Sequence, residues 1–423
     1  MSSKTKTTGA MDDSTPPLVP KLRFPEFRGG DAWEPTTIGA LGRFYYGKSA
    51  PKWSLTEDAP TPCVRYGELY TKFGPVISET YSRTNTDPKT LRFSKGGEIL
   101  IPRVGEKPED FGKSCAYLPL KGIAIGEMIS VLETKQNPLF YTYYFRKLYK
   151  EFAKVVEGQN VKNLYFTELE PLPIHLPTLP EQKKIAECLS SVDDLIAAQA
   201  RKVNALKSYK TGLMQQLFPR EGETQPRLRF PEFQEAGKWE IKRLSEVIDL
   251  ISGTHLSPGD YSSEGEIPYF TGPSDFTNDL ANVTKWTKRT ASVSQTEDTL
   301  ITVKGSGVGE IWYSTLPEVA MGRQLMAVRS KSGSSRFMFQ LLLTKRSRFE
   351  DLGSGNLIPG LSRVVILELE ACFPKQPEQQ RIADCLTTLD DLIAAKTQRY
   401  EALKRHKRAL MQQLFPSSEE VEK

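Results

Sequence analysis

The sequence contains few of the residues from which metal centres and disulfide frameworks are built. Only three of its 423 residues are histidines, His175, His255 and His406, and they lie far apart. Its five cysteines are an odd number and include no Cys-x-x-Cys pair. A zinc site, a histidine-based metal centre and a disulfide framework are therefore not indicated, and the free thiols fit a reducing cytoplasm.

Long apolar segments and a strong charge excess are missing as well. No apolar run reaches the roughly 18 residues that a membrane-spanning helix needs. Residues 1–20 lack the apolar core of a signal peptide, so we expect a disordered tail there. The formal charge of +5 comes from 57 Lys and Arg against 52 Asp and Glu, which allows a nucleic-acid partner without requiring one.

Residues 42–49, GRFYYGKS, satisfy the phosphate-loop pattern Gly-x4-Gly-Lys-Ser. A phosphate loop needs small residues whose amides surround oxyanions, and a helix must follow it directly. Here aromatic residues fill the loop, and the matching stretch at residues 248–255 keeps only the second glycine. We therefore predict a strand at residues 44–46 and a turn that projects Lys48 and Lys52, and not a nucleotide site.

The string NPLF at residues 137–140 is similar to the Asn-Pro-Pro-Tyr/Phe loop of amino-methyltransferases. The second proline is missing, and no glycine-rich cofactor turn after a strand accompanies it. A helix that begins near Pro138 explains the string. Because no set of nucleophile, base and orienting group stands out elsewhere, the sequence indicates a chain that binds and positions.

The chain consists of two similar halves. LRFPEF occurs at residues 22–27 and again at residues 228–233, and a Trp-Glu pair follows each copy. Residues 180–219 and 377–416 are identical at 24 of 40 aligned positions without a gap. Only weak similarities remain between these repeated segments. The segments that open and close each half are therefore kept, whereas the sequence between them varies.

Residues 180–218 and 377–415 are predicted to form two long helices, each about 38 residues or roughly 57 Å at 1.5 Å per residue. Their apolar positions alternate by three and four, which is the spacing of a coiled-coil seam, and two polar residues interrupt each seam at matching steps. The predicted seam residues are Ile185, Leu189, Val192, Ile196, Val203, Leu206 and Leu213 in the first helix, and Ile382, Leu386, Leu389, Ile393, Tyr400, Leu403 and Leu410 in the second.

Charge predicts how the two helices pair. The first half of each helix carries most of its acidic residues and the second half most of its basic ones, as suits a helix dipole. An antiparallel pair places each acidic half beside the basic half of the other helix. A solvated helical face is the alternative explanation of such a charge division, but two copies of one seam favour a mutual coiled coil.

The remaining segments predict two α+β domains, because short β-branched runs, turn signals and one amphipathic helix occur in each. The amphipathic helices are expected at residues 139–156 and 335–352. We predict an α+β fold in which two similar domains, residues 21–179 and 228–376, are separated by the antiparallel helices in a circular, pseudo-two-fold organisation. Residues 1–20 and 416–423 are then tails, and residues 219–227 a linker.

Two unequal domains on a rigid spacer suit duplex DNA, whose major-groove faces recur every 34–36 Å or so. Arg can read guanine, Asn or Gln can read adenine, and Lys mainly contacts phosphate. For each candidate the alternative is ordinary surface charge. The candidates are Lys48, Lys52, Arg65, Tyr66, Arg103, Lys107, Lys113 and Lys162 in the first domain, and Lys285, Lys304, Ser306, Arg323, Gln324 and Asn356 in the second.

The two helical repeats, the two LRFPEF…W openings and VRYGELYTKFG at residues 64–74 together closely resemble the specificity subunit of type I restriction–modification enzymes, the HsdS family. The resemblance covers residues 21–416. It implies that each variable region is a target recognition domain that reads one half of a split DNA sequence, while the paired helices set the unread gap. It also implies that the chain itself is not an enzyme.

The resemblance further implies the partners and the cofactors that they carry. Two modification (HsdM) subunits would bind S-adenosylmethionine and methylate a flipped adenine, and restriction (HsdR) subunits would use ATP and magnesium. This chain would bind double-stranded DNA and no cofactor of its own. Two other hypotheses stay open at this point: a coiled-coil scaffold that does not read bases, and an enzyme that uses the phosphate-loop string.

Overall fold

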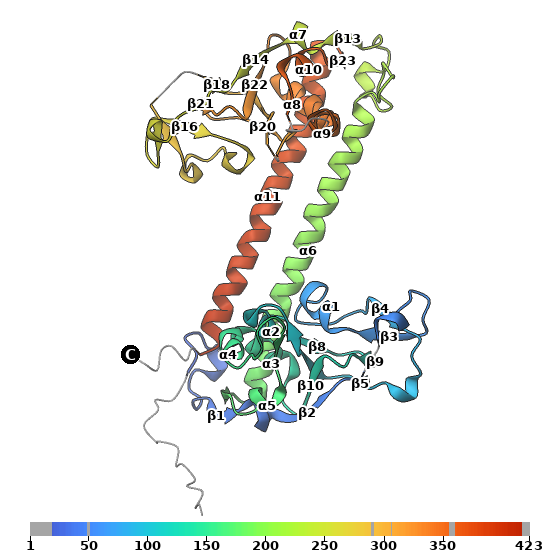
Figure 1. Cartoon of the computed structure of the whole chain (residues 1–423), viewed down its shortest axis with the longest axis vertical. Coiled ribbons are helices and arrows are strands. Elements are labelled where there is room, and N and C mark those ends of the chain that lie inside the picture. The colour runs from blue at the N-terminus through green and yellow to red at the C-terminus, as the bar shows by residue number, and fades with distance from the viewer. Residues whose placement is uncertain (1–18, 49–50, 289–291, 306, 355–359, 417–423) are drawn as a thin grey trace, which may run out of the picture. The chain divides into compact units, whose positions relative to one another are not determined.

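The computed structural model describes residues 19–48, 51–288, 292–305, 307–354 and 360–416. The chain divides into two compact units, Met1–Ala198 with Tyr400–Lys423 and Gln199–Arg399. Each unit combines one α+β module with parts of the two long helices (Figure 1). The predicted α+β class with long helices between two similar modules is confirmed.

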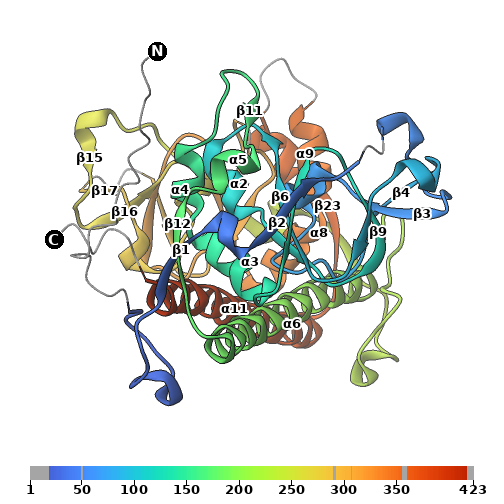
Figure 2. The ribbon, with the colours of Figure 1, turned by 90° about the horizontal axis from the view of Figure 1, so that it is seen from below.

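The first module has twelve strands and five short helices among the residues described. Its strands are β1 (Glu34–Thr37), β2 (Gly42–Tyr46), β3 (Thr61–Val64), β4 (Ser82–Thr84), β5 (Phe93–Lys95), β6 (Glu98–Pro102), β7 (Val104–Gly105), β8 (Ala116–Leu118), β9 (Lys121–Ile125), β10 (Ile129–Thr134), β11 (Lys162–Asn163) and β12 (Pro173–Leu176). Its helices are α1 (Tyr66–Thr71), α2 (Pro108–Lys113), α3 (Pro138–Lys147), α4 (Tyr149–Lys154) and α5 (Phe166–Leu169). Two four-stranded sheets have the orders β2-β10-β6-β8 and β4-β3-β9-β5, and β1 pairs with β12 and β7 with β11. Figure 2 shows β3, β4 and β9 grouped at one side of this module.

The second module repeats this plan with other lengths. Its strands are β13 (Glu240–Arg243), β14 (Ile248–Ser252), β15 (Tyr261–Ser262), β16 (Ile267–Phe270), β17 (Trp286–Thr287), β18 (Val293–Gln295), β19 (Thr299–Thr302), β20 (Ile311–Tyr313), β21 (Glu318–Met321), β22 (Leu325–Ser330) and β23 (Glu370–Phe373). Its helices are α7 (Leu244–Val247), α8 (Ser335–Thr344), α9 (Arg346–Ser354) and α10 (Arg363–Leu367). The sheet orders are β14-β22-β19-β20 and β15-β17-β16-β21-β18, with β13 pairing β23. In both modules one parallel pair, β3–β9 or β16–β21, stands among antiparallel strands.

The amphipathic segments differ from the prediction, because each is two helices and not one. The backbone leaves the helical conformation at Leu148 (ψ 18°) and at Lys345 (ψ 2°). The turn brings Phe152 of α4 and Phe349 of α9 into the core, where both are fully buried. Burial of one large aromatic side chain in each module thus outweighs continuation of the helix.

The two misleading motifs take the conformations that the sequence predicts. Residues 42–46 form strand β2, and among the described residues the next helical element is a 3-10 helix of only three residues, Lys52–Ser54. Helix α3 begins at Pro138, and the Asn137 side chain accepts a hydrogen bond from the Phe140 amide at 2.9 Å. The phosphate-loop hypothesis is therefore abandoned on structural grounds.

The two long helices are α6 (Leu179–Leu217) and α11 (Gln376–Leu414), each of 39 residues. Each begins and ends within one residue of the range predicted for it. None of the fourteen predicted seam residues is exposed, whereas Leu195 and Leu392 on the outer faces are 55% and 40% exposed.

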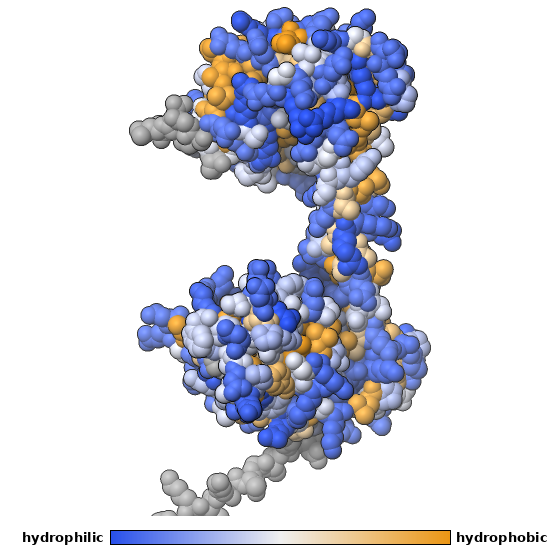
Figure 3. Space-filling model, turned by 90° about the vertical axis from the view of Figure 1, so that its right-hand side faces the viewer, coloured by the Kyte–Doolittle hydropathy of each residue, from blue (hydrophilic) through white to orange (hydrophobic). Residues whose placement is uncertain are grey.

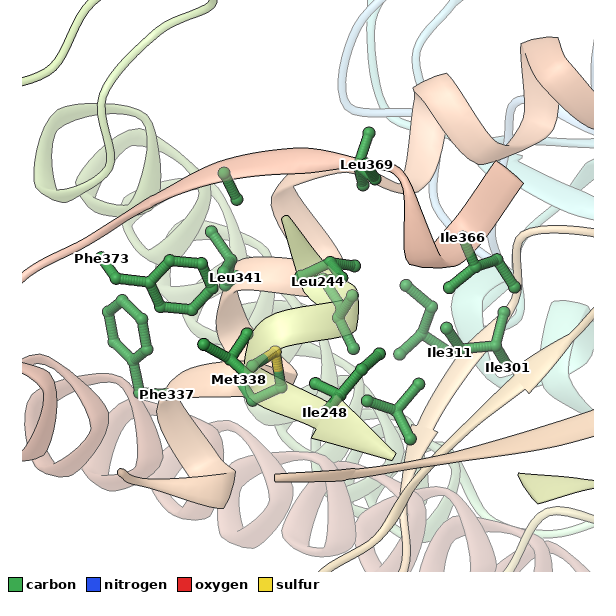
Figure 4. Packing of buried hydrophobic residues seen from close by; sticks show 14 of the residues in the cluster. Leu244, Ile248, Ile301, Ile311, Phe337, Met338, Leu341, Ile366, Leu369 and Phe373 are labelled. Carbon is green, nitrogen blue, oxygen red and sulfur yellow. The ribbon is translucent and has the colours of Figure 1, made fainter. Parts of the chain in front are cut away.

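The core of each unit joins module and helices. In the second unit Phe337, Met338 and Leu341 of α8 pack with Leu244, Ile248 and Phe373 (Figure 4). The same cluster contains Ile382 and Leu386 of α11 and Phe218 after α6. In the first unit the corresponding cluster contains α3, Ile185 and Leu189 of α6, and Phe415 after α11. Hydrophilic residues cover most of the face of each unit that Figure 3 displays.

Candidate nucleic-acid interface

In the first module several strands end at one place, which we call the first strand-end cluster. The amide of Lys48, after β2, donates to the carbonyl of Ile125 at 2.9 Å, and the Gly126 amide donates to Val64 at 3.0 Å. The Arg103 amide, after β6, donates to Met128 at 2.9 Å. Three candidates that lie far apart in the sequence, Lys48, Arg65 and Arg103, therefore lie around the turn between β9 and β10.

The second module contains the same arrangement, the second strand-end cluster. The Thr254 amide donates to Met321 at 2.8 Å, the Gly322 amide to Phe270 at 2.8 Å, and the Val303 amide to Gln324 at 2.7 Å. These contacts align Lys48 with Thr254, and the pair Arg103 and Met128 with the pair Val303 and Gln324. The backbone frame is thus repeated while the side chains on it differ.

Glycines allow the backbones of this frame to approach closely. A Cβ at Gly47 would lie 2.1 Å from the carbonyl oxygen of Gly126, and a Cβ at Gly253 would lie 2.1 Å from that of Gly322. Real Cβ atoms do not approach oxygen so closely, so any side chain there would force the strands apart. This close approach explains the glycine at position 47, within the string GRFYYGKS that satisfies the phosphate-loop pattern.

Arg103 is held firmly in the first cluster. Its guanidinium carbon lies 4.8 Å from the centre of the Tyr46 ring and 6.0 Å from that of Tyr165, and Nη2 lies 3.1 Å from Sδ of Met128. Stacking on aromatic faces orients a guanidinium. Nε of Arg103 is buried and has no hydrogen-bond partner among the described residues. Burial raises the pKa of Tyr46 against the effect of Arg103, so Tyr46 remains a neutral phenol.

The other candidates of the first module lie at several places. Lys162 faces Gly105 across the β7–β11 pair, which places it near Lys107 at the start of α2. Tyr66 begins α1 and is 37% exposed, and Lys52 is exposed at the start of the 3-10 helix Lys52–Ser54. Lys113 lies elsewhere, at the end of α2, with Nζ 4.6 Å from the centre of the Tyr149 ring and 3.9 Å from Oδ1 of Asp110.

In the second module Lys304, Arg323 and Gln324 are exposed at the cluster. Lys285 is instead engaged, because its Nζ donates to Oδ1 of Asp275 and to Oγ1 of Thr271, each at 2.9 Å. Burial opposes ionisation of Asp275, but hydrogen bonds from Thr271 and Lys285 hold the pKa of its carboxyl below the usual value. The candidates Ser306 and Asn356 lie outside the described residues.

Sequence reasoning missed Tyr46, Tyr165 and Met128 as neighbours of Arg103. The aromatic string before Gly47 was a signal for the first of these. Residues 122–132, GIAIGEMISVL, are weakly similar to residues 318–328, EVAMGRQLMAV, and this alignment places Met128 opposite Gln324, which was a signal for the third. Nothing in the sequence marks Tyr165, which reaches the cluster through the contact of the Leu164 amide with the Arg103 carbonyl at 2.8 Å.

Polar residues that interrupt the helical seam form two equivalent junctions. In the first unit Nζ of Lys407 lies 2.5 Å from Oδ1 of Asp193, and the Tyr143 hydroxyl donates to Oδ2 at 2.7 Å. Burial lowers the pKa of Lys407 although Asp193 opposes the shift. The ion pair and the hydroxyl join α11, α6 and α3 at one carboxylate.

The second junction has the same geometry. Nζ of Lys210 lies 2.6 Å from Oδ1 of Asp390, and the Gln340 amide donates to Oδ2 at 2.8 Å. In the same unit the side chain of Gln199 donates to the carbonyl of Lys396 at 2.8 Å. As the residue number rises along α6, from Gln199 to Lys210, the number of its partner on α11 falls, from Lys396 to Asp390. The predicted antiparallel pairing is therefore confirmed.

The repeated frame, the paired helices and the basic and amide side chains at the strand ends define a class: a two-module protein that confers DNA sequence specificity. The chain belongs to the type I restriction modification DNA specificity domain family, whose profile matches residues 31–208 and 236–405. It is the specificity component of such a system and not an enzyme.

Curated relatives agree with this assignment. The chain is 28% identical over 334 residues to the putative type I restriction enzyme MjaX specificity subunit of Methanocaldococcus jannaschii, covering 75% of this chain and 77% of the relative. It is 24% identical over 431 residues to the type I restriction enzyme MjaVIII specificity subunit of the same organism, covering 93% of each. The similarity therefore extends over both modules.

Solved structures share the fold. The S subunit of a type I restriction–modification system from M. genitalium matches with a TM-score of 0.66 at 18% identity, covering 95% of this chain and 100% of that one. A chain from work on complex assembly and conformational transition of the type I R-M system matches with a TM-score of 0.55 at 19% identity, covering 91% and 98%.

Neither a metal site nor a membrane span is found in the part of the chain that the structure describes. Among the described residues, no three His, Cys, Asp or Glu side chains gather as they would around a metal ion. In the same part of the chain, no helix is both long and apolar enough to cross a bilayer.

Proposed function

We propose that each module reads one half of a split, asymmetric sequence in double-stranded DNA through its strand-end cluster. One observation carries the proposal: the backbone frame of the clusters is the same in both modules, whereas the side chains that it presents differ. A shared frame suits a shared ligand, and different side chains suit two different half-sites. The number of residues in α6 and α11 would set the length of the unread gap.

The family and the features repeated in the two units support a proposal for the partners. Features present in both units, such as the exposed Leu195 of α6 and Leu392 of α11, suit two copies of one partner, for which we propose two modification subunits. Restriction subunits would complete the cutting complex. We propose that S-adenosylmethionine is bound by the modification subunits and ATP with magnesium by the restriction subunits, and that this chain works in the cytoplasm.

The test is DNA binding by the chain assembled with its modification subunits. Arg65→Ala and Arg103→Ala should each weaken binding to the specific site by about 1–3 kcal/mol if the side chain meets a base edge. Binding to a duplex of scrambled sequence should change little. Arg43→Ala is the matched control, because Arg43 is an exposed cation at the opposite end of β2.

Two other outcomes have a clear meaning. An equal loss on specific and scrambled DNA would place Arg65 or Arg103 on phosphate. Absence of any preference for a bipartite site in the unmodified complex would favour the alternative, a coiled-coil scaffold that brackets other proteins.

A further inference from the structure

The two modules place one cross-strand pair at the same point of the frame. In the first module the Arg103 amide donates to the Met128 carbonyl, and in the second the Val303 amide donates to the Gln324 carbonyl. The other side of the pair is also shared, since the Arg103 carbonyl accepts from the Leu164 amide and the Val303 carbonyl from the Leu361 amide, both at 2.8 Å. The pair Arg103 and Met128 in the first module and the pair Val303 and Gln324 in the second therefore occupy equivalent positions.

The polar and the apolar member of this pair change places between the two modules. In the first module the first member is an arginine and the second is apolar. In the second module Val303 is fully buried, and the second member, Gln324, is exposed. Each module thus presents one side chain that can make two parallel hydrogen bonds, but it comes from opposite strands.

Neither side chain is engaged by a charged group in the described part of the chain. Arg103 stacks on Tyr46 and contacts Met128, and no carboxylate forms an ion pair with it among the described residues. The amide of Gln324 lies over two glycines, since a Cβ at Gly272 or Gly305 would lie 3.2 or 3.6 Å from its Oε1. Within the described part of the chain this amide has no hydrogen-bond partner.

We propose that this pair is the base-reading position of each module, with Arg103 reading a guanine in the first half-site and Gln324 an adenine in the second. A guanidinium matches O6 and N7 of guanine, and a carboxamide matches N6 and N7 of adenine. The inference rests on the proposed function and assigns it to one residue in each module. Lysines nearby, such as Lys48 and Lys304, then contact phosphate.

The test transplants the pair of the second module into the first. The double variant Arg103→Val with Met128→Gln is expressed with the modification subunits, and methylated positions are mapped across a genome. One guanine of the first half-site should become adenine, while the second half-site and the gap stay unchanged and serve as an internal control for folding and assembly.

Two single variants keep the test decisive if the double variant does not fold. Arg103→Lys keeps the charge but removes the fork, so discrimination at that guanine should fall roughly 5- to 150-fold. Gln324→Met should weaken the requirement for one adenine, in the second half-site only. Arg43→Ala should leave the recognised DNA sequence unchanged.

The contrary results are distinct from a failure of the proposed function. Unchanged half-sites in all three variants, or methylation lowered equally at every sequence, would overturn this assignment while the bipartite function stands. A wild-type complex without any bipartite sequence would instead overturn the proposed function itself.

Discussion

At the scale of single residues, the structure separates side chains that maintain the frame from those that are presented on it. Gly47 and Gly253 belong to the first group, because the carbonyls of Gly126 and Gly322 occupy the space of a side chain. Arg103 and Gln324 belong to the second, because nothing repeated in the fold requires them.

Gly47→Ala should therefore destabilise the first module by about 1–3 kcal/mol, because the added Cβ must push β2 away from the turn between β9 and β10. Thermal unfolding followed by circular dichroism measures the effect. Gly212→Ala is the matched control: Gly212 lies inside α6, and a Cβ there would meet no atom within 4 Å, so alanine should stabilise the helix by roughly 0.5–1 kcal/mol. An unfolding temperature for Gly47→Ala at or above that of the unmodified chain would contradict this account of the frame.

Residue types alone did not show which candidates gather. Lys48, Arg65 and Arg103 meet because β3 pairs in parallel with β9, far along the chain, and local sequence patterns do not determine such a pairing. Lys285 and Lys113 carry the same charge, yet each has an acidic neighbour, Asp275 and Asp110 respectively. Which candidates gather at a strand-end cluster therefore depends on tertiary strand pairing and on acidic neighbours, and residue types alone do not show either.

At the scale of elements, the long helices were the most predictable part of the fold. Their spacing of three and four is a local signal that repeats over many turns, so the ends of α6 and α11 lie within one residue of prediction. The breaks at Leu148 and Lys345 were not predicted, because burial of Phe152 and Phe349 is decided by the tertiary core.

The junctions at Asp193 and Asp390 should contribute more than surface ion pairs do. The Lys210 side chain is only 12% exposed and that of Lys407 18%. A double-mutant cycle with Lys407→Ala and Asp193→Ala should give a coupling free energy of about 1–2 kcal/mol, measured by denaturant unfolding. The same cycle on the exposed pair Lys183 and Glu187 should give about 0.3–0.5 kcal/mol.

Equal coupling in both cycles would mean that the apolar seam alone orders the helices. A larger coupling at Asp193 would instead support a role for buried polar contacts in fixing the pairing register, as single polar seam residues do in other coiled coils.

At the scale of the whole molecule, the two ends of the chain repeat an internal connection. The Leu228 amide donates to the Gln216 carbonyl at 3.0 Å, and the Leu22 amide donates to the Gln413 carbonyl at the same distance. Arg229 pairs with Glu378 and Arg23 with Glu181, each at 2.7 Å. The start of the first module is thus held to the end of α11 as the start of the second module is held to the end of α6.

A circular permutant should therefore function. The eight residues 220–227 connect Pro219 to Leu228, so a copy of them should connect Pro416 to Leu22, with new ends at Gly222. Such a chain should still direct DNA methylation with its modification subunits. A permutant opened between Ala198 and Gln199, inside α6, is the control and should lose this activity, because it interrupts helix α6. Soluble expression of the first permutant without methylation would argue against the circular organisation.

The central claim is that two dissimilar modules read two half-sites whose separation is set by the paired helices. Its most direct test is to map methylated adenines in cells that carry the chain and its modification subunits, beside a variant lacking residues 199–205 and 394–400, one heptad or about 10 Å from each helix. The account predicts two different short sequences with a fixed gap, and the same two sequences with a shorter gap in the variant. A continuous recognition sequence, or a gap that does not change with helix length, would contradict it.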